Sequence, residues 1–191
     1  MSTLIEIAEQ VKVCTKCGLC KARAKAVPGS GNPNADVMFI GEGPGKNEDL
    51  QGEPFVGAAG KFLEELLAGI NMKRQDVFIT NVVKCRPPGN RDPEPEEVAT
   101  CYPYLEKQVA LIKPKLIVLL GRHAMYRFLP SSLQISAVHG QAFNYKGIAT
   151  EKQVYLPLYH PAVALYNGSF RDTLKKDFAK IPILLKKIAA M

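Results

Sequence analysis

The feature that most restricts the fold of this 191-residue chain is the alternation of short apolar runs with segments of helical pattern. Four runs have the composition of buried strands: residues 37–41, 77–83, 116–120 and 154–159. Helical spacing or helix-start signals mark five further segments: residues 2–13, 58–70, 95–112, 124–129 and 171–189. Strands that alternate with helices form a parallel sheet with helices on both faces. We therefore predict a three-layer α/β/α fold around a four-stranded, mainly parallel sheet.

Length and composition predict one globular domain over residues 1–191. The chain has the length of one domain, and its 47% hydrophobic and 23% charged residues are ordinary for a protein with a buried core. Its longest aliphatic runs are far shorter than the roughly 20 residues of a membrane-spanning helix. The first ten residues carry acidic side chains where a signal peptide needs basic ones. We therefore expect a cytoplasmic protein, and we expect it to be a monomer.

An excess of basic residues suits an anionic partner. Lysine and arginine number 25 against 18 acidic residues, which gives a net charge of +7. Nucleic acid fits this balance, although many basic proteins bind nothing anionic. Lys84, Arg86 and Arg91 flank the rigid segment Pro87-Pro-Gly-Asn90. Such a loop can hold phosphates with little ordering entropy, and an ordinary solvated loop fits the same residues equally well.

Three unusual segments follow predicted strands. They are the glycine-rich turn 41–45, the segment 81–91 and the pair His160-Pro161. Ligands of parallel α/β sheets bind outside the carboxyl ends of the strands, so we expect these segments to converge on one crevice. The turn has the spacing of neither a phosphate loop nor a dinucleotide fingerprint. It allows a ligand to approach the backbone closely, and Glu42 and Glu48 lie beside it.

Five cysteines suggest a metal site rather than a disulfide scaffold. Three of them form the run Cys14-x-x-Cys17-x-x-Cys20, a clustering that in a cytosolic chain more often holds a metal. Cys14 and Cys17 together with Cys85 and Cys101 would supply four thiolates, which suit either tetrahedral zinc or an iron–sulfur cluster. The loose spacing of the second pair favours the cluster without deciding the question, and a set that includes Cys20 stays open.

Together these motifs closely resemble the iron–sulfur, or family 4, branch of the uracil-DNA glycosylase superfamily. The resemblance runs from Cys14 to about Asn167. Its motifs are Cys14-Thr-Lys-Cys17, Gly41-Glu-Gly-Pro-Gly45, Gly52-Glu-Pro-Phe-Val-Gly57, Asn81-Val-Val-Lys-Cys-Arg-Pro-Pro88, Asn90-Arg91, Cys101 and His160-Pro161-Ala162. It implies an α/β/α enzyme that hydrolyses the uracil–deoxyribose bond in single- or double-stranded DNA and so starts base-excision repair. It also implies a 4Fe-4S cluster on Cys14, Cys17, Cys85 and Cys101, with a structural role that ties down the N-terminal segment.

The resemblance assigns a uracil pocket. A base must leave the stack before its glycosidic bond can be reached, and an aromatic face then stacks on it; Phe55 is the candidate. One asparagine amide can satisfy the N3 donor and O4 acceptor of uracil while leaving cytosine unpaired, a role that falls to Asn81. Gly41, Glu42 and Gly43 border the base, and Glu48 crowds the side on which thymine carries its methyl group.

The same resemblance assigns the catalytic groups. His160 donates to uracil O2, where negative charge develops as the bond breaks. A carboxylate near C1′ would orient water and stabilise the cationic sugar. Glu42 is our first choice and Glu48 the second. This chain departs here from the better-known glycosylases, which carry an aspartate where it has Gly43.

DNA contacts are predicted from the basic loop and from the end of the last motif. Lys84, Arg86 and Arg91 would grip phosphates, and Leu165 would fill the gap that the everted base leaves, with Tyr166 next in order. Two departures from the family pattern stand out. Many relatives read His-Pro-x-Tyr-Leu-Leu-Arg where this chain continues from His160 as His-Pro-Ala-Val-Ala-Leu-Tyr, and Cys20 is an extra thiol.

Two other functions compete with this prediction. A non-catalytic DNA-binding module with a redox-sensing cluster would not need Glu42, Asn81 and His160 together. A glycosylase for hypoxanthine or other deaminated bases is disfavoured by the Glu42-Gly-Pro motif, which differs in relatives of broader range.

Overall fold

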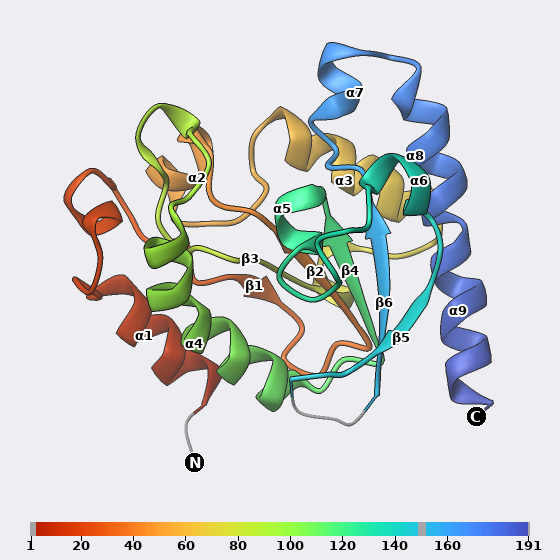
Figure 1. The fold of residues 1–191 in the computed structure, drawn as a ribbon, viewed down its shortest axis with the longest axis horizontal. Coiled ribbons are helices and arrows are strands. Elements are labelled where there is room, and N and C mark those ends of the chain that lie inside the picture. Colours follow the sequence, from red (N-terminus) through yellow and green to blue (C-terminus); the bar gives the residue numbers. More distant parts are fainter. Residues whose placement is uncertain (1–2, 149–151, 191) are drawn as a thin grey trace.

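The computed structural model describes residues 3–148 and 152–190, which are built around one six-stranded sheet of order β1-β3-β2-β4-β6-β5 (Figure 1). The central strands run parallel: β3 (Phe78–Asn81), β2 (Val37–Gly41), β4 (Leu116–Leu120) and β6 (Gln153–Leu158). The outer strands, β1 (Ser30–Gly31) and β5 (Phe143–Tyr145), pair antiparallel with their neighbours. The predicted α/β class and mainly parallel sheet are confirmed. The predicted number of four strands is too low, because the two edge strands are only two and three residues long and carry almost no strand pattern.

The central strands are mostly apolar because both faces of the sheet are covered. Successive residues of a strand point to opposite faces. In β2, Met38 and Ile40 join one buried cluster, whereas Val37 and Phe39 join another. The strands β4 and β6 divide their side chains in the same way. The fold therefore has two cores, one on each side of the sheet.

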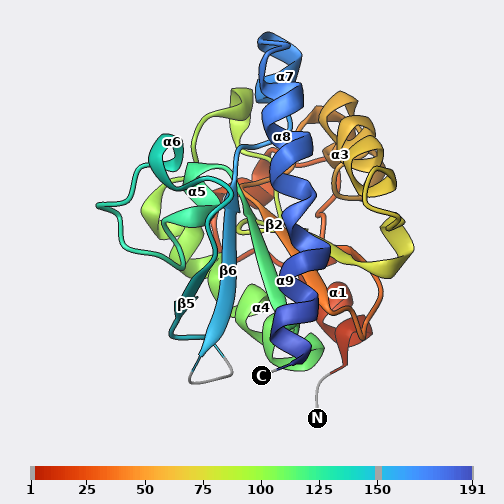
Figure 2. The ribbon, with the colours of Figure 1, turned by 90° about the vertical axis from the view of Figure 1, so that its right-hand side faces the viewer.

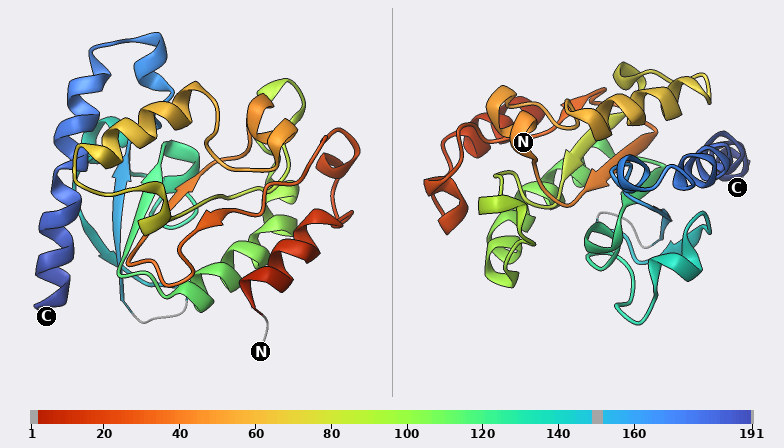
Figure 3. Two further views of the ribbon diagram at one scale, coloured as in Figure 1. Left: turned by 180° about the vertical axis from the view of Figure 1, so that it is seen from behind. Right: turned by 90° about the horizontal axis from the view of Figure 1, so that it is seen from above.

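Helices cover each core, as the view from above shows (Figure 3). One face carries α1 (Leu4–Lys12), α4 (Pro95–Ile112) and α5 (Arg122–Met125). The other face carries α3 (Ala58–Ala68), α8 (Phe170–Phe178) and α9 (Lys180–Ala189), the last two stacked end to end in Figure 2. Short helical turns fill the connections: η1 (Gly18–Lys21), α2 (Lys46–Gln51), η2 (Arg74–Asp76), η3 (Pro88–Asn90), α6 (Ile135–Val138) and α7 (Val163–Tyr166).

Some predicted helix limits are wrong. The C-terminal helix predicted over 171–189 is two helices that meet at Ala179, because Pro182 has no backbone N–H with which to continue the first one. The predicted helix 2–13 corresponds to α1, with residue 2 lying outside the described residues. Among the described residues, none of the helices is both long enough and apolar enough to span a membrane.

The parallel strands place their carboxyl ends along one edge of the sheet. Gly41 at the end of β2 pairs with Asn81 at the end of β3, and Leu120 of β4 pairs with Leu158 of β6. The chain that follows β2, β3 and β6 therefore starts from neighbouring points. This edge lies toward the top of Figure 1, where β6 leads into α7.

Candidate active site and thiol site

A cavity of about 310 Å³ lies at this edge of the sheet. The three segments that the sequence singles out all contribute to its wall, as predicted. The cavity brings together the side chains of Glu42, Glu48, Phe55, Asn81 and His160. Gly43 and Arg91 also line it. Lys84, Arg86 and Leu165 are not among the lining residues.

Asn81 presents an unused hydrogen-bond acceptor to the cavity. The residue is 2% exposed, and its Oδ1 is the buried side-chain atom that lacks a hydrogen-bond partner among the described residues. A Cβ atom at Gly41 would lie 2.4 Å from this oxygen, so the strand β2 must carry glycine there. Leaving a buried acceptor unpaired costs about 1–3 kcal/mol. The amide is thus arranged for a donor that arrives from outside the protein.

His160 is held as a neutral ring. Its Nδ1 accepts a hydrogen bond from the backbone N–H of Ala162 at 3.2 Å, which places the proton of the neutral ring on Nε2. Burial lowers the pKa of His160 to about 4, against the opposing effect of Glu48. The ring stacks on Phe55 with centroids 5.4 Å apart and planes inclined by 28°. His160 therefore offers an uncharged N–H donor beside an aromatic face.

The two carboxylates of the cavity differ in freedom. Glu48 Oε1 accepts backbone N–H groups from Val56 and Gly57, both at 2.9 Å, so this side chain holds a loop. Glu42 lies 4.0 Å from the Nε2 of His123, and burial raises its pKa, an effect that His123 opposes. A carboxylate with a raised pKa that faces a cavity is a better candidate for chemistry than one already engaged with the backbone.

Lys84 is not a phosphate-binding residue at the surface, and that prediction is wrong. The side chain is 1% exposed, and its Nζ donates to Thr80 Oγ1 at 2.6 Å, to Gln108 Oε1 at 2.7 Å and to the Asn81 carbonyl at 2.8 Å. Three acceptors compensate for burial of the ammonium group. Burial lowers the pKa of Lys84 to about 7. The residue supports the backbone of Asn81 from inside the core.

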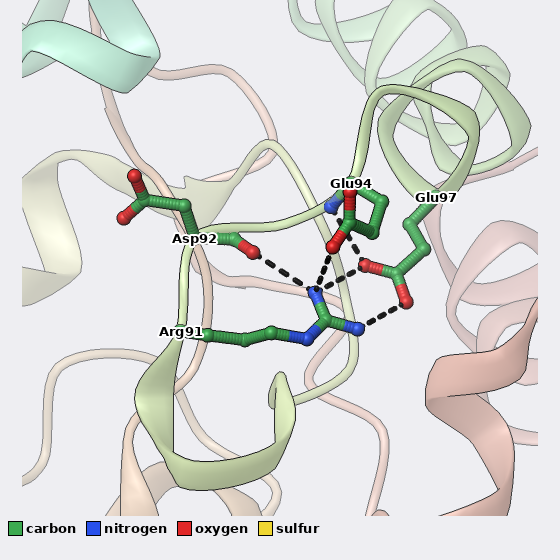
Figure 4. Close-up of polar contacts among 4 residues, drawn as sticks. All are labelled: Arg91, Asp92, Glu94 and Glu97. Atoms are coloured by element: carbon green, nitrogen blue, oxygen red, sulfur yellow. Dashed lines mark hydrogen bonds and ion pairs between the residues drawn. The ribbon is translucent and has the colours of Figure 1, made fainter.

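Arg91 lines the cavity, but its guanidinium donates hydrogen bonds to acceptors within the protein (Figure 4). It makes a two-pronged ion pair with Glu97 at 2.8 and 2.9 Å, and it donates to the Asp92 carbonyl at 2.9 Å. The pair lowers the pKa of Glu97. Glu97 lies in the first turn of α4, so this ion pair connects the cavity wall to the helix that carries Cys101.

The other predicted DNA contacts lie at the surface. Arg86 donates through Nε to Asn90 Oδ1 at 2.8 Å, and within the described residues it has no carboxylate partner. Leu165 and Tyr166 stand on α7 with 46% and 91% of their surface exposed. Both are close in sequence to His160, which lies in the cavity.

Two polar pairings, one of them in the cavity wall, were not predicted from the sequence. Asp92 lines the wall and lies 3.3 Å from the Nε2 of His123, which places both residues next to Glu42. His139 pairs through Nδ1 with the buried Asp177 at 2.6 Å and stacks on Tyr159. These partners are far apart in sequence and no local pattern marks them.

All five cysteines line a second, smaller cavity between α1, η1 and α4. Arg23 donates to Cys85 Sγ at 3.0 Å, and the backbone N–H of Lys84 donates to Cys101 Sγ at 3.3 Å. Such donors stabilise sulfur in its thiolate form.

Charge effects link several of these thiols to one another. Burial raises the pKa of Cys85, and Cys17 and Cys14 add to this effect. Burial likewise raises the pKa of Cys101 to about 11, with smaller contributions from Cys85 and Cys17. Cys20 contributes to neither of these two shifts, although with Cys85 and Cys14 it raises the pKa of Arg23. Thiols gathered around one cavity, two of them with pKa values raised by burial, fit a metal group with thiolate ligands.

Comparisons with known proteins agree with the family resemblance of the sequence motifs. A family model for the uracil DNA glycosylase superfamily matches residues 28–181. The chain is 49% identical over 188 residues to a type-4 uracil-DNA glycosylase of Sulfurisphaera tokodaii, covering 95% of this chain and 84% of the relative. It is 47% identical over 191 residues to the type-4 enzyme of Archaeoglobus fulgidus, covering 98% and 96%. Identity to a type-5 uracil-DNA glycosylase of Thermus thermophilus is 36% over 121 residues, 56% of this chain and 55% of the relative.

Proposed function

The chain belongs to the uracil-DNA glycosylase superfamily, and from this membership we propose that it is a uracil-DNA glycosylase of the type-4 kind. It hydrolyses the bond between uracil and deoxyribose in single- or double-stranded DNA and leaves an abasic site that starts base-excision repair. The observation that carries the proposal is the unpaired, buried Oδ1 of Asn81 in a cavity that also holds Phe55 and the neutral His160.

The proposal is tested with an oligonucleotide that contains one uracil. We expect alkali-labile breaks at that position and release of free uracil, and we expect intact strands when thymine or cytosine replaces it. Binding of the uracil strand without any break would support the DNA-binding module instead. Breaks at hypoxanthine but not at uracil would support a glycosylase of different range.

Uracil recognition follows from the donors and acceptors of the base. Uracil offers a donor at N3 and an acceptor at O4, and cytosine reverses both. Asn81 Oδ1 accepts from N3 and the amide nitrogen donates to O4. Phe55 supplies the stacking face, and the Gly41, Glu42 and Gly43 backbone borders the base. Glu48 crowds the C5 side, which disfavours thymine.

Bond cleavage is assisted at both ends of the breaking bond. Negative charge gathers on uracil O2, where the Nε2–H of His160 donates to it. Positive charge develops on the sugar, where Glu42 stabilises it and orients the attacking water. A Cβ atom at Gly43 would lie 2.8 Å from Val83 Cγ2, so an aspartate there would require Val83 to shift. That crowding supports Glu42 as the source of the carboxylate.

Replacing Glu42 by glutamine is expected to slow single-turnover uracil release by about a hundred-fold. The carboxylate must be ionised, and burial raises its pKa, so the wild-type rate should fall as the pH decreases through a value above 4.5. The variant should lose this acidic limb. Glu106→Gln, on the exposed side of α4, is the matched control. A larger loss in Glu48→Gln, with the limb intact in Glu42→Gln, would reverse the assignment.

DNA is held by side chains around the cavity mouth. Arg86 contacts phosphate directly, and Arg91 adds positive charge while its ion pair with Glu97 keeps the loop in place. Leu165 fills the gap left by the everted base, with Tyr166 beside it. Their exposure on α7 supports this role.

A 4Fe-4S cluster on Cys14, Cys17, Cys85 and Cys101 is also part of the proposal. The charge effects of Cys14 and Cys17 on Cys85, and of Cys85 and Cys17 on Cys101, support this ligand set. When bound, the cluster would tie the N-terminal segment to the chain between Cys85 and Cys101, and hydrolysis draws no electron from it. A single-domain, monomeric and cytoplasmic protein completes the proposal. The five cysteines are free thiols, as suits a reducing cytoplasm.

Cysteine substitutions separate the ligands from the extra thiol. Cys85→Ala is expected to lose the iron and the broad brown absorbance of the anaerobically purified protein, and Cys20→Ala to keep both. Iron analysis and ultraviolet–visible spectra measure the difference. A colourless wild-type protein that contains zinc would overturn the assignment of the metal, and loss of iron from Cys20→Ala would overturn the ligand set.

A further inference from the structure

We propose that Arg74, which is not among the residues lining the cavity, is a positioning residue that fixes the ring of Phe55 for stacking on the everted base. The inference rests on the function proposed above and adds a residue to it. It starts from an unusual backbone conformation at the stacking residue itself.

Phe55 has a left-handed backbone, with φ of +53°. Bulky residues seldom adopt this conformation, and where they do, the surrounding structure has to hold it. The ring is 5% exposed and stacks on His160. A Cβ atom at Gly41 would lie 3.0 Å from its edge. A change of φ at this residue would therefore move the ring away from both neighbours.

Arg74 donates hydrogen bonds to two consecutive carbonyl groups, those of Pro54 and of Phe55 itself. Its Nη1 donates to the Phe55 carbonyl at 2.9 Å, and its Nη2 donates to the Pro54 carbonyl. Glu64 on α3 lies 3.7 Å from the guanidinium and helps to orient it. Two parallel N–H donors in a planar fork suit two neighbouring carbonyls, and a lysine ammonium cannot reproduce that geometry.

Two further contacts complete the support of this loop. A Cβ atom at Gly60 would lie 1.8 Å from the Phe55 oxygen, so the carbonyl is pressed against the first turn of α3. On the amide side, Glu48 accepts the N–H groups of Val56 and Gly57. Arg74 thus fixes the carbonyls of the loop and Glu48 fixes its amides.

Arg74→Met and Arg74→Lys test the inference. Both are expected to lower kcat/KM for a uracil-containing oligonucleotide by roughly ten-fold. Both are also expected to weaken inhibition by free uracil by roughly ten-fold. Affinity for the same oligonucleotide without uracil should stay within about two-fold, because Arg74 lies away from the phosphates in this scheme. The lysine variant keeps the charge, so it separates loss of the two-point donation from loss of charge.

A second background separates positioning from general stability. In Phe55→Ala, adding Arg74→Met should cost less than about two-fold in activity, because no ring is left to position. Arg171→Met is the matched control, since it removes a surface ion pair between Arg171 and Glu65 on α3. It should lower Tm without changing uracil inhibition.

The outcomes are distinguishable. If the wild-type protein releases no uracil, the proposed function fails. If it does, and Arg74→Lys keeps full activity, or Arg74→Met costs the same factor with and without Phe55, the positioning role fails.

Discussion

Asn81→Asp is expected to reduce uracil release by about ten thousand-fold, the largest loss of any single change in this site. The carboxylate offers two acceptors and no donor, so uracil O4 would face a negative oxygen instead of an amide N–H. Burial at 2% exposure removes the water that would otherwise screen this repulsion. Lys84 does not offset this repulsion, because its Nζ donates to the Asn81 backbone carbonyl rather than to the side chain.

Single-turnover assays on a uracil-containing single strand measure the effect directly. Asn144→Asp makes the same change on the exposed edge strand β5 and should leave the rate unchanged. Far-UV circular dichroism and affinity for DNA without uracil show whether the variant is folded. A folded Asn81→Asp protein with near-wild-type release would rule out recognition through this amide.

The position of the site was predictable because a parallel sheet fixes where strand ends lie. Gly41 and Asn81 are 40 residues apart in the chain, yet they pair in register at the ends of β2 and β3. His160 follows β6 at the same edge, and its neighbour Pro161 marks the end of the strand. Strand pattern and topology alone place these three residues together.

Side-chain direction at the basic loop was not predictable in this way. Lys84 follows a strand in a segment rich in basic residues. No local pattern shows that its ammonium group donates to Thr80 and Gln108 in the core. Arg91 likewise pairs with Glu97 because the first turn of α4 lies against the loop. Such pairings depend on the packed structure, since isolated charges of either kind would favour water.

Lys84 and the Arg91–Glu97 ion pair connect the two sites. Lys84 donates through its ammonium to the Asn81 carbonyl and through its backbone N–H to Cys101 Sγ. Arg91 and Glu97 make a second connection, because Glu97 lies one helical turn before Cys101 on α4. Under the proposed function, a group held by the thiols would support the uracil pocket through these contacts.

His160→Ala is expected to slow the chemical step by about a thousand-fold while changing DNA affinity by less than about two-fold. The Nε2–H meets uracil O2 as negative charge develops there, and it contributes little before the bond begins to break. Single-turnover rates at saturating enzyme, compared with dissociation constants for the same strand, separate the two effects. Equal losses in rate and in affinity would show that His160 binds the substrate instead.

The protonation state of His160 gives this prediction a second, independent test. Burial lowers its pKa to about 4, so the ring stays neutral from about pH 5 to pH 9, and the ratio of wild-type to His160→Ala rates should be constant over that range. If the cationic ring were the active form, the ratio would instead shrink as the pH rises through the ordinary histidine value near 6.5. A constant ratio fits a neutral donor whose Nδ1 is already occupied by the N–H of Ala162, since protonating that nitrogen would break the bond that orients the ring. The cavity therefore keeps the donor uncharged. Its hydrogen bond to uracil O2 becomes stronger as negative charge develops on that oxygen.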